Sequence, residues 1–108
     1  MSVTPDEFRR MALAHADAAE SAHMKHPDFR VRGRVFATLG YPDGEYGMVK
    51  LAPAKQAEFV RSSPKAFAPA KGSWGRQGST CVRLSAVKKR ELASALLAAW
   101  SHVARKRR

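Results

Sequence analysis

A glycine-rich segment in the second half of the sequence combines residue types that could bind phosphate or an aromatic ring. It runs from Lys71 to Thr80, with glycines at positions 72, 75 and 78. Glycine lets a partner approach the backbone closely, Trp74 offers a flat ring for stacking, and Lys71 and Arg76 add positive charge. The alternative is a hairpin turn whose tryptophan plugs the edge of the core, because regularly spaced glycines more often serve turns than ligands. The segment alone leaves both interpretations open.

A second segment, from His23 to Asp28, contains two histidines and a carboxylate that could act as metal ligands or as an acid–base pair. Pro27 breaks regular structure next to His26, so these side chains need not converge. A metal site needs three or four converging ligands with supporting hydrogen bonds. We therefore expect neither a metal nor a catalytic centre here.

Other signatures of catalysis are also missing from the sequence. It contains no glycine-serine nucleophile elbow, paired carboxylate site, dinucleotide fingerprint or cysteine–histidine pair. We expect a protein that is not an enzyme and that uses no cofactor.

The charge of the chain is strongly positive and unevenly distributed. Its 20 Lys and Arg residues outnumber nine Asp and Glu, which gives a formal net charge of +11. Residues 1–28 hold three basic and five acidic side chains, a net charge of −2, so residues 29–108 carry +13. Such an imbalance suits an anionic partner, although it also keeps a protein soluble.

Length and cysteine content bound the architecture and the compartment. A chain of 108 residues fits one domain, 1–108, with a basic tail at 105–108. The single Cys81 excludes an internal disulfide, fits a reducing compartment and, from its strand pattern, is predicted to be a buried thiol. No apolar run approaches the length of a membrane span or a signal peptide. We expect a cytoplasmic protein that does not contact membranes.

Local patterns predict the elements that carry these segments. Thr4 and Glu7 form a capping box at the start of a helix, which its alanine-rich composition allows to run past Ala19. Residues 29–39 predict two strands joined by a tight turn at Arg32-Gly33, and residues 47–51 predict a third strand. A helix then begins at Ala52-Pro53.

The last part of the chain predicts a strand followed by a long helix. Residues 80–84 alternate as a half-buried strand does. Ser85 is the predicted cap of the final helix. An apolar stripe on that helix should cover the sheet, and it consists of Leu92, Leu96, Ala99, Trp100 and Val103.

Several stretches together resemble the MmcQ/YjbR family. They are His26-Pro27-Asp28-Phe29-Arg30-Val31, residues 33–39, residues 72–78, and the pairs Glu91-Leu92 and Ala99-Trp100. Their order and spacing extend over almost the whole chain. The sequence departs from the family at Ser79, where the resemblance implies a bulky aromatic residue, and this weakens any stacking role for that side chain.

The resemblance implies an α+β fold. The implied architecture is a single two-layer domain with the order α-β-β-β-α-β-β-α and an antiparallel sheet covered by helices, similar to that of secretion chaperones. It also implies that the first helix stops near Asp17 and that residues 20–25 form a strand, against the local propensity.

For function, the resemblance implies DNA binding through two β-hairpins that act as wings. Matched by position, the wings present Arg30, Arg32 and Arg34 on the first and Lys71, Trp74 and Arg76 on the second. These cations would neutralise phosphates of duplex DNA with little choice of sequence. We expect them to form one basic surface, with the tryptophan partly exposed beside it.

A protein-interaction module is the alternative from another class. Secretion chaperones, which have a similar α/β arrangement, bind polypeptides on a sheet face or a dimer surface. An exposed apolar patch would favour this alternative, whereas a continuous basic face would favour nucleic acid.

Overall fold

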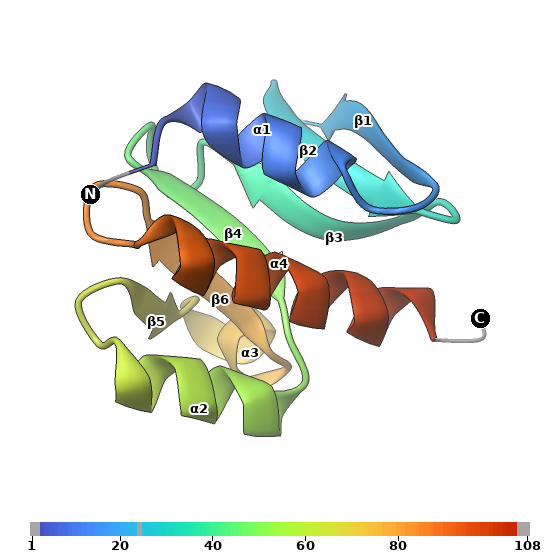
Figure 1. Cartoon of the computed structure of the whole chain (residues 1–108). Coiled ribbons are helices and arrows are strands. Elements are labelled where there is room, and N and C mark those ends of the chain that lie inside the picture. Colours follow the sequence, from blue (N-terminus) through green and yellow to red (C-terminus); the bar gives the residue numbers. More distant parts are fainter. Residues whose placement is uncertain (1–2, 24, 106–108) are drawn as a thin grey trace.

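The computed structural model describes residues 3–23 and 25–105 of the chain. The described elements are α1 (Pro5–Leu13), β1 (Ala18–His23), β2 (His26–Val31), β3 (Arg34–Leu39), β4 (Tyr46–Lys50), α2 (Pro53–Ser62), β5 (Phe67–Pro69), α3 (Gly72–Arg76), β6 (Ser79–Arg83) and α4 (Lys89–Ala104). Figure 1 shows α1 and α4 lying across one face of the sheet, with α2 near β5. Residues 106–108 of the predicted basic tail lie outside the described residues. No helix in the described ranges is long and apolar enough to span a membrane.

The strands of the described part form one antiparallel sheet in the order β1-β2-β3-β4-β6-β5. This confirms the predicted α+β fold with an antiparallel sheet and helices packed on it. The element order differs from the predicted one in two places: four strands instead of three precede α2, and α3 stands between β5 and β6. The additional strand is β1, which the resemblance placed at residues 20–25.

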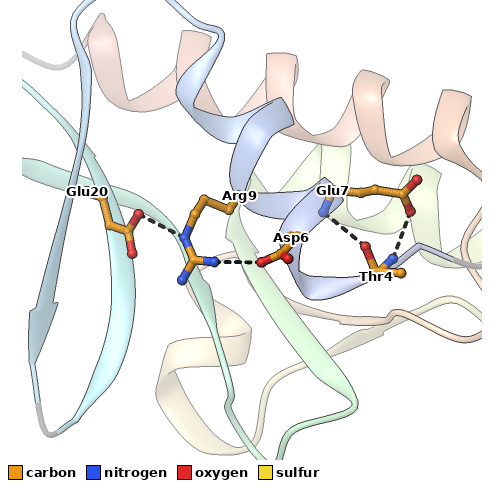
Figure 2. A network of polar contacts seen from close by, with 5 residues as sticks. All are labelled: Thr4, Asp6, Glu7, Arg9 and Glu20. Carbon is orange, nitrogen blue, oxygen red and sulfur yellow. Dashed lines mark hydrogen bonds and ion pairs between the residues drawn. The ribbon is translucent and has the colours of Figure 1, made fainter.

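Helix α1 begins where predicted and ends earlier than its composition suggests. The Thr4 hydroxyl accepts the Glu7 N–H at 3.1 Å, and the Glu7 carboxylate accepts the Thr4 N–H at 2.9 Å (Figure 2). After Leu13 the chain turns, and Asp17 has a φ of 60°, which a right-handed helix cannot include. The helix therefore does not run past Ala19 as local propensity allows, and it stops early as the resemblance implies.

Glu7 also joins α1 to α4, because its Oε2 lies 2.8 Å from Lys89 Nζ. The hydrogen bond from Lys89, together with that from Thr4, lowers the pKa of Glu7 from 4.5 to about 2. Since the folded-state pKa is the lower one, the stabilising contribution is present above pH 4.5 and is lost as the pH falls toward 2.

We expect Glu7→Gln to flatten the acid limb of a plot of urea midpoint against pH. The matched control is Glu45→Gln in the exposed connection between β3 and β4, which should keep the wild-type slope. An acid limb equally steep in the Glu7 variant would contradict a role for the pair with Lys89.

The sheet has one face covered by helices and one open face. Side chains on the covered face enter a core whose largest fully buried rings are Phe8, Phe29, Phe36 and Phe67. Because side chains alternate along a strand, the residues between core positions point to the open face. Across β4 and β6, Met48 lies opposite Cys81 and Lys50 lies opposite Ser79. Cys81 is half-buried there rather than fully buried as predicted, and this burial raises the pKa of its thiol.

Helix α4 carries the apolar stripe that the sequence predicts. Its buried residues are Leu92, Ala95, Leu96, Ala99 and Val103. Trp100 is half-buried: it stacks on His15 with ring centroids 5.8 Å apart and donates its indole N–H to the Ala16 carbonyl at 2.9 Å. It therefore closes the connection between α1 and β1, where burial lowers the pKa of His15.

The predicted cap at Ser85 is wrong, because α4 begins only at Lys89. The turn after β6 first buries Val87 in the core, and the helix starts beyond it. At this start the Glu91 carboxylate accepts the Lys88 N–H at 2.9 Å and also the Ser63 hydroxyl hydrogen bond. These hydrogen bonds lower the pKa of Glu91.

Candidate nucleic-acid interface

The two segments predicted to bind phosphate lie at the same end of the sheet. Arg32 and Gly33 form the predicted turn between β2 and β3, and both have positive φ, 54° and 81°, as a two-residue hairpin turn of type I′ requires. Antiparallel pairing then places the end of β4 and the start of β6 beside this turn, with Lys50 opposite Ser79. The end of β5 pairs with Thr80, so the glycine-rich segment leaves the sheet at the same end.

The three arginines of the first predicted wing have different partners in the structure. Arg30 donates two hydrogen bonds, of 2.9 and 3.1 Å, to the fully buried Asp28 carboxylate, and they raise the pKa of the guanidinium. Arg32 donates from Nη1 to the Ala104 carbonyl at 3.0 Å, where it complements the negative end of the α4 dipole. Arg34 has no ion pair with any described residue. The charge of Arg30 is thus balanced by Asp28, whereas Arg32 and Arg34 have no carboxylate partner among the described residues.

The glycine-rich segment connects β5 and β6, which pair as consecutive antiparallel strands. The connection differs from a tight hairpin turn, because residues 72–76 form the short helix α3. Close packing explains the glycines: a Cβ at Gly75 would lie 1.7 Å from the Ala70 carbonyl oxygen, and one at Gly78 would lie 1.7 Å from the Leu51 carbonyl oxygen. These two glycines therefore allow α3 to lie against neighbouring backbone. These two glycines are therefore explained by the packing of the fold.

Gln56 on α2 fixes this segment, a role that the sequence analysis did not identify. Its side-chain amide is buried and donates to the carbonyls of Gly75 and Ser79, at 2.9 and 3.0 Å, and lies 3.1 Å from Thr80 Oγ1. The Thr80 hydroxyl in turn donates to the Gly78 carbonyl at 2.9 Å. A polar residue on the inner side of a helix indicates a buried hydrogen bond, and this signal was available at Gln56. Its partners could not be identified from it, because they lie about 20 residues away in sequence.

The side chains that α3 presents to solvent are those predicted to bind. Trp74 is 61% exposed, and Lys71 and Arg76 on either side of it are exposed as well. Neither cation has an ion pair with any residue in the described ranges. The tryptophan is therefore not a plug at the edge of the core, and it remains available for stacking.

A pocket of about 570 Å³ opens on the free face of the sheet, a volume typical of small-ligand sites. It is lined by His26, Val35, Thr38, Tyr41, Met48, Lys50, Trp74 and Ser79. Val35 and Thr38 both face it although they are three residues apart, because the pairing of β2 with β3 shifts register there. Strand alternation could have indicated the β4 and β6 residues, but not this bulge.

The described side chains between His23 and Asp28 lie in two different surroundings. The Asp28 carboxylate is engaged by Arg30, whereas His26 lines the pocket. In the part of the chain that the structure describes, no group of three His, Cys, Asp or Glu residues is placed to hold a metal ion. The side chain of His23 lies outside the described residues.

An antiparallel sheet with two helices across one face and a pocket on the other defines a two-layer α+β domain. The YjbR family model matches residues 12–102, and the chain belongs to the YjbR family. The crystal structure of Deinococcus radiodurans protein DR2400, described with the domain DUF419, is similar with a TM-score of 0.81 and 18% sequence identity, over 97% of this chain and 81% of that chain. At this identity the likeness shows the fold. A comparison with curated proteins finds no match.

Proposed function

We propose that this protein binds duplex DNA through its phosphate backbone and that it does so without catalysis. The observation that carries the proposal is a set of cations without an ion pair among the described residues on both sides of one sheet end: the half-buried Arg34 beside the β2–β3 turn, and the exposed Lys71 and Arg76 around α3. We call this set, together with Arg32 and Lys50, the basic end of the sheet. Phosphate contacts of this kind give affinity without specifying sequence.

The spacing of the basic end suits a duplex. Neighbouring strands lie about 4.8 Å apart, so the three steps from β3 through β4 and β6 to β5 separate its two sides by about 14 Å. Phosphates follow one another at about 3.4 Å of axial rise along each strand. The two sides could therefore contact phosphates about four base pairs apart.

Exposed apolar side chains give weaker support to a protein-interaction module. The large hydrophobic residues with the most exposure are Leu13, Tyr41, Trp74 and Leu97. The two leucines lie on helices α1 and α4, whereas the two aromatic residues line the pocket on the open face. Because this exposed apolar surface is divided between the two sides of the sheet, the charge is the stronger guide to function.

The salt dependence of duplex binding tests the proposal. If Arg32, Arg34, Lys71 and Arg76 each neutralise one phosphate, a log–log plot of affinity against salt should have a slope of about −3.6. The double variant Lys71→Gln/Arg76→Gln should then flatten the slope by about 1.8 for unrelated sequences alike.

The matched control is Lys65→Gln/Arg90→Gln, which removes the same charge from the opposite end of the sheet. Lys65 precedes β5 and Arg90 lies in the first turn of α4, and both are exposed. The control should keep most of the wild-type slope. If both double variants flatten the salt slope equally, net charge alone drives binding. If the wild type does not bind duplex DNA even at low salt, the proposal fails and an interaction module is favoured.

A further inference from the structure

The geometry points to the pocket on the open face as a binding site for one unpaired nucleotide, whose base would enter the pocket while its phosphate meets Lys50. This inference rests on the proposed function in one respect, because both use Lys50 in the basic end of the sheet. It adds a second mode, in which the protein recognises a base that is not in a duplex. The nucleotide could be free or part of a single strand, and these two sources share the chemistry argued below.

The first observation is a buried hydroxyl without a partner. Thr38 lines the pocket with 6% of its surface exposed, and Oγ1 is the only buried side-chain oxygen or nitrogen of the described residues that lacks a hydrogen bond. Such a group is costly to leave unsatisfied and is rare in folded proteins. A base carries donors and acceptors along its edge, so it offers this hydroxyl the partner that the protein does not supply.

The second observation is the pair of aromatic rings at the pocket. Tyr41 and Trp74 come from the β3–β4 connection and from α3, and they are 43% and 61% exposed. Bases stack on exposed aromatic side chains of open sheets, and such stacking tolerates any base because each has a flat face. Met48 and Val35 add an apolar wall to the same pocket.

The third observation is the charge of the lining. The residues that line the pocket include the positively charged Lys50 and no carboxylate. Asp28, the nearest acid along β2, is already held by Arg30. The site is therefore complementary to an anionic ligand with a flat apolar body, which describes a nucleotide.

A peptide fits this position less well. Extended peptides bind sheets by pairing with an exposed edge strand. The pocket lies over β3, β4 and β6, each of which is already paired on both sides. Backbone pairing is unavailable there, so side chains must provide the recognition.

Fluorescence of Trp74 provides the test. The chain has two tryptophans, so in the Trp100→Phe variant the fluorescence comes from Trp74 alone and reports on the pocket. If the site binds free nucleotides, deoxynucleoside monophosphates and a short single-stranded oligothymidylate should both quench the emission of Trp74. If the site binds a nucleotide only within a single strand, oligothymidylate alone should quench it. In binding measured by anisotropy of a labelled oligothymidylate, Trp74→Ala should weaken affinity roughly 5- to 150-fold. Leu97→Ala, an exposed truncation on α4, should leave the affinity unchanged.

Thr38→Val separates a ligand site from a structural defect. It removes the unpaired hydroxyl at nearly constant shape, so the urea midpoint should stay equal or rise while nucleotide affinity falls about 2- to 10-fold. A Thr38 variant that binds as tightly as the parent would overturn the role of the hydroxyl.

The outcomes distinguish this inference from the proposed function. Duplex binding without any quenching by single strands or nucleotides would overturn the nucleotide site and leave the phosphate proposal standing. Quenching by single strands without duplex binding would support the site and overturn the duplex proposal. Quenching by laurate but not by nucleotides would assign the pocket to an apolar acid and overturn the inference.

Discussion

Replacing Leu96 with alanine should lower the free energy of unfolding by about 2 to 5 kcal/mol, because the change removes a fully buried side chain and leaves a cavity. Leu96 lies in the middle of α4, which packs across β3 and β4. Little rearrangement can fill the space, since the hydrogen bond from Ser63 to Glu91 holds the start of the helix and the contact of Arg32 with Ala104 holds its end. Domains of this size have about 5 to 15 kcal/mol of total stability, so this single change removes a large share.

Urea unfolding of the wild type and of Leu96→Ala measures the effect. The matched control is Leu97→Ala at the next position of the same helix, where the side chain is 53% exposed and its loss should change stability by about 0.5 kcal/mol or less. Similar midpoints for the two variants would show that α4 does not form part of the core.

The elements of this fold were predictable where one face of an element is apolar. Leu92, Leu96 and Val103 recur at helical spacing, and all three are buried in α4. Strand β1 lacks such a signal, because its sequence, Ala-Ala-Glu-Ser-Ala-His, favours a helix in isolation. Its conformation follows from pairing with β2, a tertiary interaction that the resemblance implied and local propensity could not.

The glycine-rich segment shows a different limit. Three glycines and a tryptophan fit a hairpin tip or a short helix equally well by local rules. What decides between them is the approach of two remote carbonyls, from Ala70 and Leu51, and the amide of Gln56. Gln56 lies on a helix that precedes β5, so its meeting with the segment depends on the completed sheet.

For the candidate site, the charges were predictable but their partners were only partly so. Asp28 and Arg30 are two apart on a strand, and such residues share a face, so their ion pair could have been anticipated. The bond from Arg32 to Ala104 joins residues 72 positions apart and could not. The pocket depends on both the register shift in β3 and the small side chain of Ser79, where a bulky one would occupy part of its volume.

Gly78 is the position where the largest effect of a single added methyl group is expected. Its φ is 115°, which side-chain-bearing residues rarely adopt, and an added Cβ would lie 1.7 Å from the Leu51 carbonyl oxygen. That oxygen belongs to the backbone, and the neighbouring Leu51 N–H donates to the Gly78 carbonyl at 3.0 Å, so neither side can move without breaking the junction of β4 and β6. We expect Gly78→Ala to destabilise the protein by about 3 kcal/mol or more, from the combined cost of the backbone conformation and the overlap.

The control for this substitution is Gly44→Ala in the exposed turn between β3 and β4, where an added Cβ meets no atom within 4 Å. It should change the free energy of unfolding by about 0.5 kcal/mol or less. Urea midpoints of the two alanine variants should therefore differ widely. The Gly78 variant should also lose binding of DNA at temperatures where it remains mostly folded, because Gly78 directly follows the segment that carries Lys71, Trp74 and Arg76. A Gly78 variant as stable as the Gly44 variant would contradict the close approach of these two strands and, with it, the fixed position of α3 on which the candidate site depends.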